Sequence, residues 1–501
     1  MTAPLPPWLE DFRARHDATV IETHISWLLL AGALAWKIKK PISLPFLDYG
    51  NAARRRCCCE AELRLNRQFA PDLYLGTEAI GHSDDGEEWA VRMRRFPEAQ
   101  RLDHVCAHGH LRLDQLSALA TTLHRFHTRT AVAGPESPFG EPAQVFAQAI
   151  ENFTELVTLA PAHADRLATL EAWTRDEFAR IRPTLAARKA AGRVRECHGD
   201  LHLGNLVLLE GQPQAFDAIE FNPTLRWIDV VADIAFLVMD LQARDRADGA
   251  WRFLDGWLAQ EGDFAGMAVL RYYTVYRALV RARVAGMRAT QALPASAQAM
   301  ARAECAHYLA LARQCMQPRS AELWLTHGLS GSGKSTQALG LVQARGVVRL
   351  RADVERKRLF GLAPGADSTA IDGGIYTPQA TERTYEHLRQ QARLVLQSGY
   401  TVLVDASFLD PAMRAPFLAL AQELGVVCRI LAFEAPLAVL RERVRARQQE
   451  GGDPSEADEA VLLAQWAARQ PFSAAELGHV LRVDTTRAVD WDHLLPAAHT
   501  K

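Results

Sequence analysis

Eight consecutive residues follow the pattern G-x-x-x-x-G-K-[ST], in which a glycine-rich turn precedes a lysine and a hydroxyl side chain. An apolar stretch lies before this run and a helical pattern follows it. Glycines allow such a turn to bring backbone N–H groups onto phosphate oxygens at a helix N-terminus. The lysine then reaches the β- and γ-phosphates, and the hydroxyl binds Mg²⁺. The residues predicted to bind ATP and Mg²⁺ here are Gly328, Ser330, Gly331, Ser332, Gly333, Lys334, Ser335 and Thr336.

Two aspartates follow later apolar runs and are candidates for the same site. Asp405 closes one run, at the position where a carboxylate can hold the metal ion through water. Asp353 follows another run, and it could be either the base for a substrate hydroxyl or a second carboxylate near the metal. The alternative for each is a helix cap or turn residue.

Four arginines recur at every second position from Arg441 to Arg447. On a helix they form two i,i+4 pairs, Arg441 with Arg445 and Arg443 with Arg447. One pair could contact phosphates from a lid, because arginine suits multidentate phosphate binding. The pattern leaves open which pair does so, and a solvated helix face is the alternative.

A second group of polar residues lies in the first half of the chain. The run His198-Gly199-Asp200 is followed by Asn205 and, after a predicted β-hairpin, by Asp217. Phosphoryl transfer needs a carboxylate that accepts or orients the acceptor hydroxyl, and oxygen ligands that hold Mg²⁺ between the ATP phosphates. The spacing would deliver these groups from two adjacent strand ends.

This pattern resembles the aminoglycoside-phosphotransferase branch of the protein-kinase-like fold, in which HGD replaces the kinase HRD. The resemblance implies that Asp200 is the catalytic base and that Asn205 and Asp217 are metal ligands. It also implies that His198 is a structural residue of the catalytic loop and that Asp233 braces this loop.

The same resemblance requires a lysine on a strand of the N-terminal lobe, which pairs with the ATP phosphates and is oriented by a helix glutamate. The A-x-K pattern ends at Lys37, and Lys39 on the same strand face is the reserve. Glu62 is the expected partner, with Glu60 as the alternative. No G-x-G-x-x-G run precedes Lys37, so the phosphate clamp departs from the kinase pattern.

The last ~180 residues resemble small P-loop kinases of the zeta-toxin, AAA_33-like, gluconate-kinase and polynucleotide-kinase group. This resemblance implies that Asp353 and Arg356 lie near the acceptor and that an arginine of the 441–447 run belongs to a lid. The whole chain thus resembles a bacterial fusion of an aminoglycoside-phosphotransferase-like kinase with a P-loop kinase-like domain, a combination often labelled bifunctional.

Periodicity predicts the elements that position the first group of residues. Short strands around a hairpin at Ala31-Gly32 precede a helix over 54–67, and a further strand follows it. Helical periodicity dominates 111–192 and 228–314, with short strands and turns between them. Together with the resemblance, this order predicts an α+β, two-lobed, protein-kinase-like domain over 1–318.

The remainder, 319–501, is predicted to be an α/β P-loop NTPase domain. Strands that alternate with helices indicate parallel βαβ units and hence a parallel sheet. The predicted strands cover 322–327, 347–350, 401–405 and 427–433.

Composition excludes several classes of protein. Among 501 residues, 49% are hydrophobic and 23% charged, with a net charge of −2, as is typical of globular domains rather than disordered chains. This balance argues against a long nucleic acid or an anionic membrane as partner. The longest apolar run, 27–36, is about half a membrane span, and eight cysteines without disulfide or metal spacing indicate reduced thiols. We therefore expect a cytoplasmic protein, and its oligomeric state stays open.

The predicted function is that of a bifunctional, ATP- and Mg²⁺-dependent kinase. The first domain would phosphorylate a hydroxyl of a small molecule, and the P-loop domain would bind ATP and phosphorylate a small-molecule or nucleotide-type acceptor. Arginines interleaved with acidic residues over 240–263 disfavour an aminoglycoside acceptor. Two alternatives remain: a nucleotide-sensing protein in which one domain controls the other, and a nucleic-acid 5′-hydroxyl or nucleotide-sugar acceptor for the P-loop domain.

Overall fold

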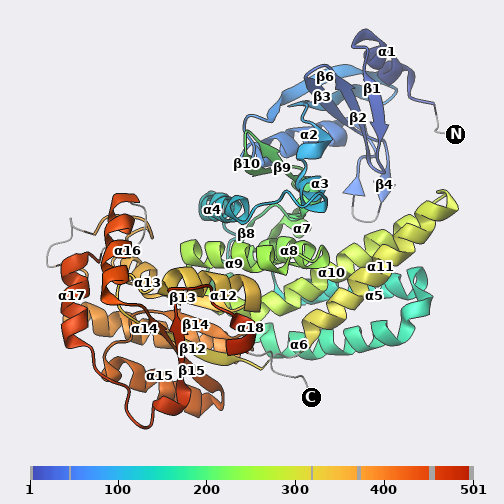
Figure 1. Cartoon of the computed structure of the whole chain (residues 1–501). Helices are drawn as coiled ribbons and strands as arrows, with labels where there is room; N and C mark the ends of the chain where they lie inside the picture. Colours follow the sequence, from blue (N-terminus) through green and yellow to red (C-terminus); the bar gives the residue numbers. More distant parts are fainter. Residues whose placement is uncertain (1–3, 45–46, 318–319, 369–373, 451–456, 496–501) are drawn as a thin grey trace. The chain divides into compact units, whose positions relative to one another are not determined.

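The chain forms two compact units, seen here in a computed structural model (Figure 1). Unit 1 contains the residues up to Asp245 and Tyr272–Cys315, whereas unit 2 contains Arg246–Arg271 and the residues from Met316 onward. The units therefore do not follow a single cut near 318, and residues 318–319 lie outside the described part of the chain. The structure describes residues 4–44, 47–317, 320–368, 374–450 and 457–495.

Unit 1 opens with a five-stranded antiparallel sheet in the order β1-β2-β3-β7-β6. The predicted hairpin at Ala31-Gly32 joins β2 to β3, and the predicted helix over 54–67 is α2, capped by the Asn51 side chain. The elements of this lobe are α1 (Pro7–Arg15), β1 (Thr19–Glu22), β2 (Ser26–Ala31), β3 (Leu34–Lys39), β4 (Ser43–Leu44), β5 (Leu47–Asp48), α2 (Ala52–Asn66), β6 (Tyr74–Ser83) and β7 (Gly86–Arg94).

The remainder of unit 1 is mainly helical, with two short strand pairs at its centre. Strand β8 (Val194–Glu196) pairs with β11 (Trp227–Asp229), and β9 (Leu206–Leu209) pairs with β10 (Gln212–Ala215). The two-lobed α+β protein-kinase-like fold is confirmed. Its helices are α3 (Leu102–Ala107), α4 (Leu113–Arg129), α5 (Pro142–Leu159), α6 (Ala164–Ala190), α7 (Pro223–Arg226), α8 (Val230–Ala243), α10 (Met267–Ala289) and α11 (Ala295–Met316).

Unit 2 is built on a five-stranded parallel sheet in the order β13-β14-β12-β15-β16. The four predicted strands and the α/β P-loop fold are confirmed, and β16 is a fifth strand that periodicity did not predict. The strands are β12 (Glu322–His327), β13 (Val348–Arg351), β14 (Val402–Asp405), β15 (Val427–Glu434) and β16 (Val480–Asp484). The helices are α9 (Ala247–Glu261), α12 (Lys334–Arg345), α13 (Ala352–Leu359), α14 (Pro378–Gln397), α15 (Pro411–Leu424), α16 (Leu437–Glu450), α17 (Glu459–Ala468) and α18 (Trp491–Leu494).

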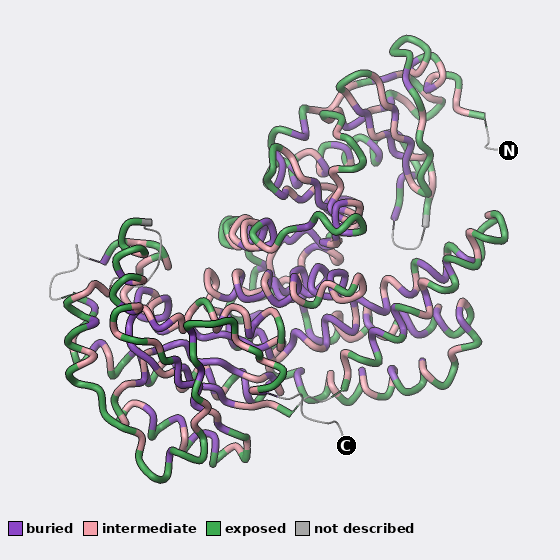
Figure 2. The backbone as a smooth tube through the Cα atoms, in the orientation of Figure 1, coloured by how far each residue is buried: buried purple, intermediate pink, exposed green. Residues whose placement is uncertain are grey.

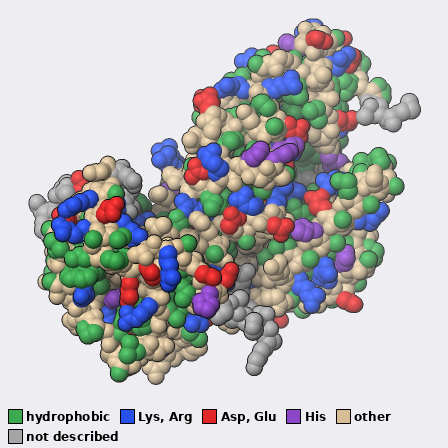
Figure 3. Space-filling view, viewed as in Figure 1, with side chains coloured by type: hydrophobic (Ala, Val, Ile, Leu, Met, Phe, Trp, Pro, Cys, Tyr) green, Lys and Arg blue, Asp and Glu red, His purple; other side chains and the backbone are tan. Residues whose placement is uncertain are grey.

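Burial follows from this layering. All residues of β14 and the middle of β12 are buried, as the purple tube in Figure 2 shows, because helices cover both faces of a parallel sheet. Basic and acidic side chains are interspersed over the face seen in Figure 3, as the balanced charge predicts. Among the described helices, none combines the length and apolarity needed to cross a membrane.

Candidate active sites

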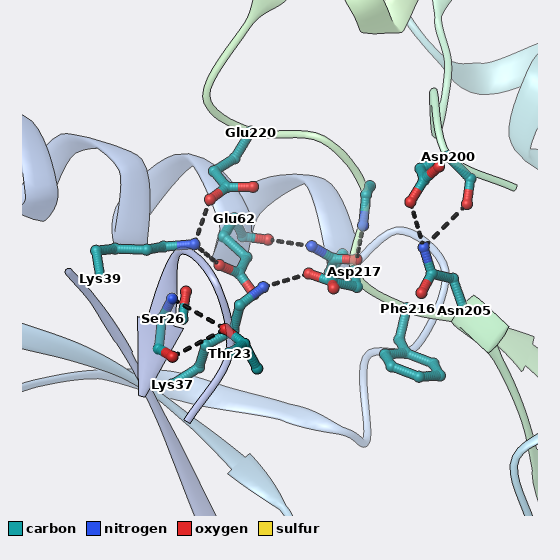
Figure 4. A network of polar contacts seen from close by, with 12 residues as sticks. Thr23, Ser26, Lys37, Lys39, Glu62, Asp200, Asn205, Phe216, Asp217 and Glu220 are labelled. Carbon is teal, nitrogen blue, oxygen red and sulfur yellow. Dashed lines mark hydrogen bonds and ion pairs between the residues drawn. The ribbon is translucent and has the colours of Figure 1, made fainter. Parts of the chain in front are cut away.

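The first site forms where β3 meets α2 and the segment after β10. Lys37 on β3 places its Nζ atom 3.0 Å from the Glu62 carboxylate and also contacts the carboxylate of Asp217 (Figure 4). Glu60 instead pairs with Arg56 on the exposed face of α2. Burial opposes ionisation of Asp217, but Lys37 outweighs it and lowers the pKa of this carboxyl. The structure therefore brings Lys37, Glu62 and Asp217 together.

Lys39, which the sequence analysis gave only as the reserve for Lys37, also belongs to this network. Lys39 is fully buried and contacts both Glu62 and Glu220, and Tyr49 donates a hydrogen bond of 2.6 Å to Glu220. Glu62 thus accepts from two lysines at once. In the sequence, Glu220 is notable only for lying three residues after Asp217, and the fold is needed to show that it contacts Lys39.

The loop between β8 and β9 carries the remaining predicted residues. The amide of Asn205 donates to the Asp200 carboxylate at 2.8 Å and to the Asp200 carbonyl at 3.0 Å, and His202 Nε2 lies 3.4 Å from the same carboxylate. Burial acts against ionisation of Asp200, yet His202 and Arg281 hold the pKa of this group well below its usual range. Asp200 is therefore ionised near neutral pH and able to accept a proton.

Asp233 at the start of α8 braces this loop. It accepts hydrogen bonds from the N–H groups of His198, at 3.2 Å, and Gly199, at 2.9 Å, while His127 lies 3.1 Å away. Gly199 has φ +85°, and a Cβ there would lie 2.7 Å from the carbonyl oxygen of Leu225. The glycine of the HGD run is thus required by both its conformation and its surroundings.

The loop and the segment that carries Asp217 are tied together. His198 Nε2 lies 2.9 Å from the carbonyl oxygen of Phe216, and the N–H of Asp217 donates to the hydroxyl of Tyr74 at 3.0 Å. Asp217 itself adopts a left-handed conformation, with φ +64°. These residues fit a divalent cation. The Asn205 side chain uses its nitrogen for the hydrogen bonds to Asp200, so its carbonyl oxygen can be a ligand, and Asp217 supplies a carboxylate.

The second site lies at the carboxyl edge of the parallel sheet, in the loop from β12 to α12. Gly331 and Gly333 have φ of +78° and +82°, and a Cβ on Gly331 would lie 2.6 Å from the carbonyl oxygen of Leu440. Lys334 Nζ donates to the carbonyl oxygens of Gly328 and Leu329, at 2.8 Å each. This loop can close only with glycines at these positions, and the N–H groups at the start of α12 are then free to meet an anion.

The predicted carboxylates converge on this loop from neighbouring strands. Asp405 at the end of β14 lies 3.4 Å from the hydroxyl of Ser335, and its other oxygen, Oδ2, is buried without a hydrogen bond from any described residue. A carboxylate oxygen beside a serine hydroxyl fits the outer sphere of a Mg²⁺ ion. Asp353 at the start of α13 has a raised pKa, because it is buried and faces Asp405.

A cavity of about 680 Å³ connects these groups. Residues of the glycine loop, Asp353, Asp405 and the aromatic side chains Tyr376 and Tyr385 line it. Arg356 also borders the cavity and donates to the carbonyl oxygen of Ile375 at 3.0 Å. The cavity lining thus combines the glycine loop with a carboxylate, an arginine and two phenols.

The structure also decides between the arginine pairs. Arg443 and Arg447 line the cavity, and Arg443 donates to Thr485 at 3.0 and 2.7 Å. Arg441 and Arg445 both pair with Glu459 on α17 and are exposed. The alternative of a solvated helix face therefore fits Arg441 and Arg445, whereas Arg443 and Arg447 are the pair that lines the cavity.

Comparisons with known proteins give one family match within unit 2 and relatives that align over most of the chain. The AAA_33 family, described as an AAA domain, matches residues 323–472, within unit 2. The uncharacterized protein Rv2004c of Mycobacterium tuberculosis is 34% identical over 475 residues, which cover 93% of this chain and 92% of the relative. The uncharacterized protein Mb2027c of Mycobacterium bovis matches equally well. These alignments span both units.

Solved structures align with each part separately, at low identity. The amicoumacin kinase hAmiN in complex with AMP-PNP, Ca²⁺ and Ami aligns with a TM-score of 0.40 at 15% identity, covering 61% of this chain and 94% of its own. A choline/ethanolamine kinase family protein from Mesorhizobium loti gives 0.36 at 14% identity, covering 61% and 99%. A gluconokinase from Sinorhizobium meliloti 1021 gives 0.24 at 18% identity, covering 34% and 86%.

Proposed function

This chain belongs to the family of the uncharacterized mycobacterial protein Rv2004c, and we propose from the two sites that it is a bifunctional ATP-dependent phosphotransferase. Unit 1 transfers the γ-phosphoryl group of ATP to a hydroxyl of a small molecule. Unit 2 binds ATP in its glycine loop and phosphorylates a small-molecule or nucleotide-type acceptor. The observation that carries the proposal is the convergence of Lys37, Glu62 and Asp217 beside the Asp200–Asn205 pair (Figure 4).

In unit 1, the ionised carboxylate of Asp200 accepts the proton of the acceptor hydroxyl. The oxygen of that hydroxyl forms a bond to the γ-phosphorus, the bond from this phosphorus to the β-bridging oxygen breaks, and ADP leaves. Lys37, oriented by Glu62, neutralises phosphate charge. A divalent cation, when bound by Asn205 and Asp217, supplies further charge neutralisation. Asp233 keeps the loop in place through its two backbone hydrogen bonds.

In unit 2, the glycine loop and Lys334 bind the phosphates while Ser335 and Asp405 hold the divalent cation. Asp353 lines the same cavity, where its raised pKa suits a base that takes a proton from an acceptor hydroxyl. Arg356 lies beside it and suits an acceptor that carries negative charge.

Incubation of the protein with γ-labelled ATP and a metabolite extract tests the proposal. We expect two classes of labelled product, of which Asp200→Asn removes one and Lys334→Ala removes the other. Loss of both classes in either single variant would support instead the alternative in which one domain controls the other. Absence of any label transfer by the wild-type protein, in several extracts, would contradict the assignment as a phosphotransferase.

A further inference from the structure

Unit 2 contains a segment from the first half of the sequence, residues 246–271. Helix α9 of this segment packs on α12 and β13. The indole of Trp251 covers Gly346 so closely that an added Cβ would lie 2.4 Å from its nitrogen, and it packs edge-on against Tyr400. Arg358 donates to two carbonyl oxygens at the end of α9, at 2.7 and 3.0 Å. The segment is therefore a fixed part of the P-loop unit.

One carboxylate of α9 reaches the nucleotide site through an arginine. Asp255 accepts two hydrogen bonds from Arg349 on β13, at 3.1 Å from Nε and 2.7 Å from Nη2, and both side chains are more than nine-tenths buried. The remaining nitrogen of the guanidinium, Nη1, donates to the carbonyl oxygen of Ser335 at 3.3 Å. The Asp255–Arg349 pair thus contacts the backbone of Ser335, whose hydroxyl faces Asp405.

Arg349 also lies close to the carboxylate of Asp405. Nη1 of Arg349 lies 3.9 Å from Asp405 Oδ2, the oxygen that makes no hydrogen bond with a described residue. Without Asp255, a buried guanidinium would lose its bidentate partner and would gain most by moving onto this nearby carboxylate. That movement would occupy the oxygen that Mg²⁺ needs and withdraw the contact to Ser335.

We propose that Asp255 is a positioning residue for the metal–nucleotide site of unit 2. It holds Arg349 in a bidentate pair, which keeps Ser335 in place and leaves Asp405 available to a divalent cation. The inference rests on the proposed function of unit 2 as an ATP site. It also means that this site depends on a residue that precedes the P-loop by more than seventy positions.

Calorimetric titration of the full chain with Mg·ATP and with metal-free ATP in EDTA tests this role. Comparison with Lys334→Ala identifies the signal of the P-loop site. We expect Asp255→Asn to weaken Mg·ATP binding there ~10-fold or more, as for other residues that orient metal ligands, and metal-free ATP much less. Adding Arg349→Gln to Asp255→Asn should restore part of the Mg²⁺ dependence, because the charge that competes for Asp405 is gone while the contact to Ser335 stays lost.

The matched control is Glu476→Gln, which breaks another buried arginine–carboxylate pair of unit 2, that of Glu476 with Arg414 at 2.6 and 3.1 Å. Its Mg²⁺ dependence should equal that of the wild type. Any of three results would overturn the positioning role. These are an Mg²⁺ dependence of Asp255→Asn equal to that of the wild type, equal losses of Mg·ATP affinity in Asp255→Asn and Glu476→Gln, and no rescue in the double variant. If Lys334→Ala removes no ATP signal, the proposed function of unit 2 fails instead.

Discussion

The ammonium group of Lys37 lies 3.0 Å from the carboxylate of Glu62, and the same carboxylate also contacts Lys39. The two lysines differ in surroundings, because Lys37 retains 15% of its side-chain exposure and faces Asp217, whereas Lys39 is fully buried between Glu62 and Glu220. Lys37 thus lies at the proposed nucleotide site, and Lys39 contacts the carboxylate that pairs with Lys37.

Substitution should separate these roles. Lys39→Met removes the cation of buried Glu220 and one of the two cations of buried Glu62, and it should lower the free energy of unfolding by about 3 kcal/mol. Lys37→Met should cost less stability but abolish ATP binding in unit 1. Urea unfolding and calorimetry measure the two effects. Similar stability losses in both variants, with ATP binding retained in Lys37→Met, would show that Lys37 is only structural.

Replacing the proposed base should affect chemistry and spare binding. Asp200→Asn removes the proton acceptor and should slow phosphoryl transfer by unit 1 about 10²- to 10⁴-fold. Because Asp200 is not expected to hold the ATP phosphates, the affinity of unit 1 for ATP should change little. Transfer of label from γ-labelled ATP, measured beside an ATP titration, checks both expectations. An undiminished rate of transfer would exclude Asp200 as the base.

The arginines of α16 offer a matched pair of variants. Arg443→Gln removes a cation that lines the cavity and should weaken ATP binding in unit 2. Arg441→Gln removes an exposed partner of Glu459 and should leave the affinity unchanged, because exposed ion pairs contribute little. Titration of both proteins with Mg·ATP compares them directly, and equal affinities would argue against a phosphate contact by Arg443.

ATP binding by unit 2 should depend on pH through Lys334. Burial lowers the pKa of Lys334 to about 8, although Asp405 and Asp353 act in the opposite direction. The ammonium form binds phosphate, so the affinity should fall as the pH rises through 8, by ~10-fold between pH 7 and 9. Lys334→Arg stays charged over this range and should show a flat profile. A flat wild-type profile would mean that Lys334 is not the titrating group.

Much of both sites could be predicted from sequence because local motifs place their residues. The glycine turn, the HGD run and the strands that end in carboxylates are continuous or nearly continuous in sequence, and the structure assembles them accordingly. The choice of Glu62 over Glu60 needed the fold, since both lie on α2 and only the packing of this helix against the sheet, on β6 and β7, decides which one faces Lys37.

Contacts between distant segments were beyond sequence reasoning. Glu220 and Tyr49 meet Lys39 only when three separate parts of unit 1 come together. The pairing of Asp255 with Arg349 is a similar case, because helical periodicity identifies α9 but carries no information on which unit it packs against. Strand β16 was missed because only its Val483 is buried, so its apolar signal is weak.

The central claim is that one chain holds two independent ATP sites, and counting those sites tests it most directly. Calorimetric titration of the full chain with a non-hydrolysable Mg·ATP analogue should give two sites per chain, and Lys334→Ala should leave one. A single site in the wild-type protein, or a site count unchanged by Lys334→Ala, would contradict the account.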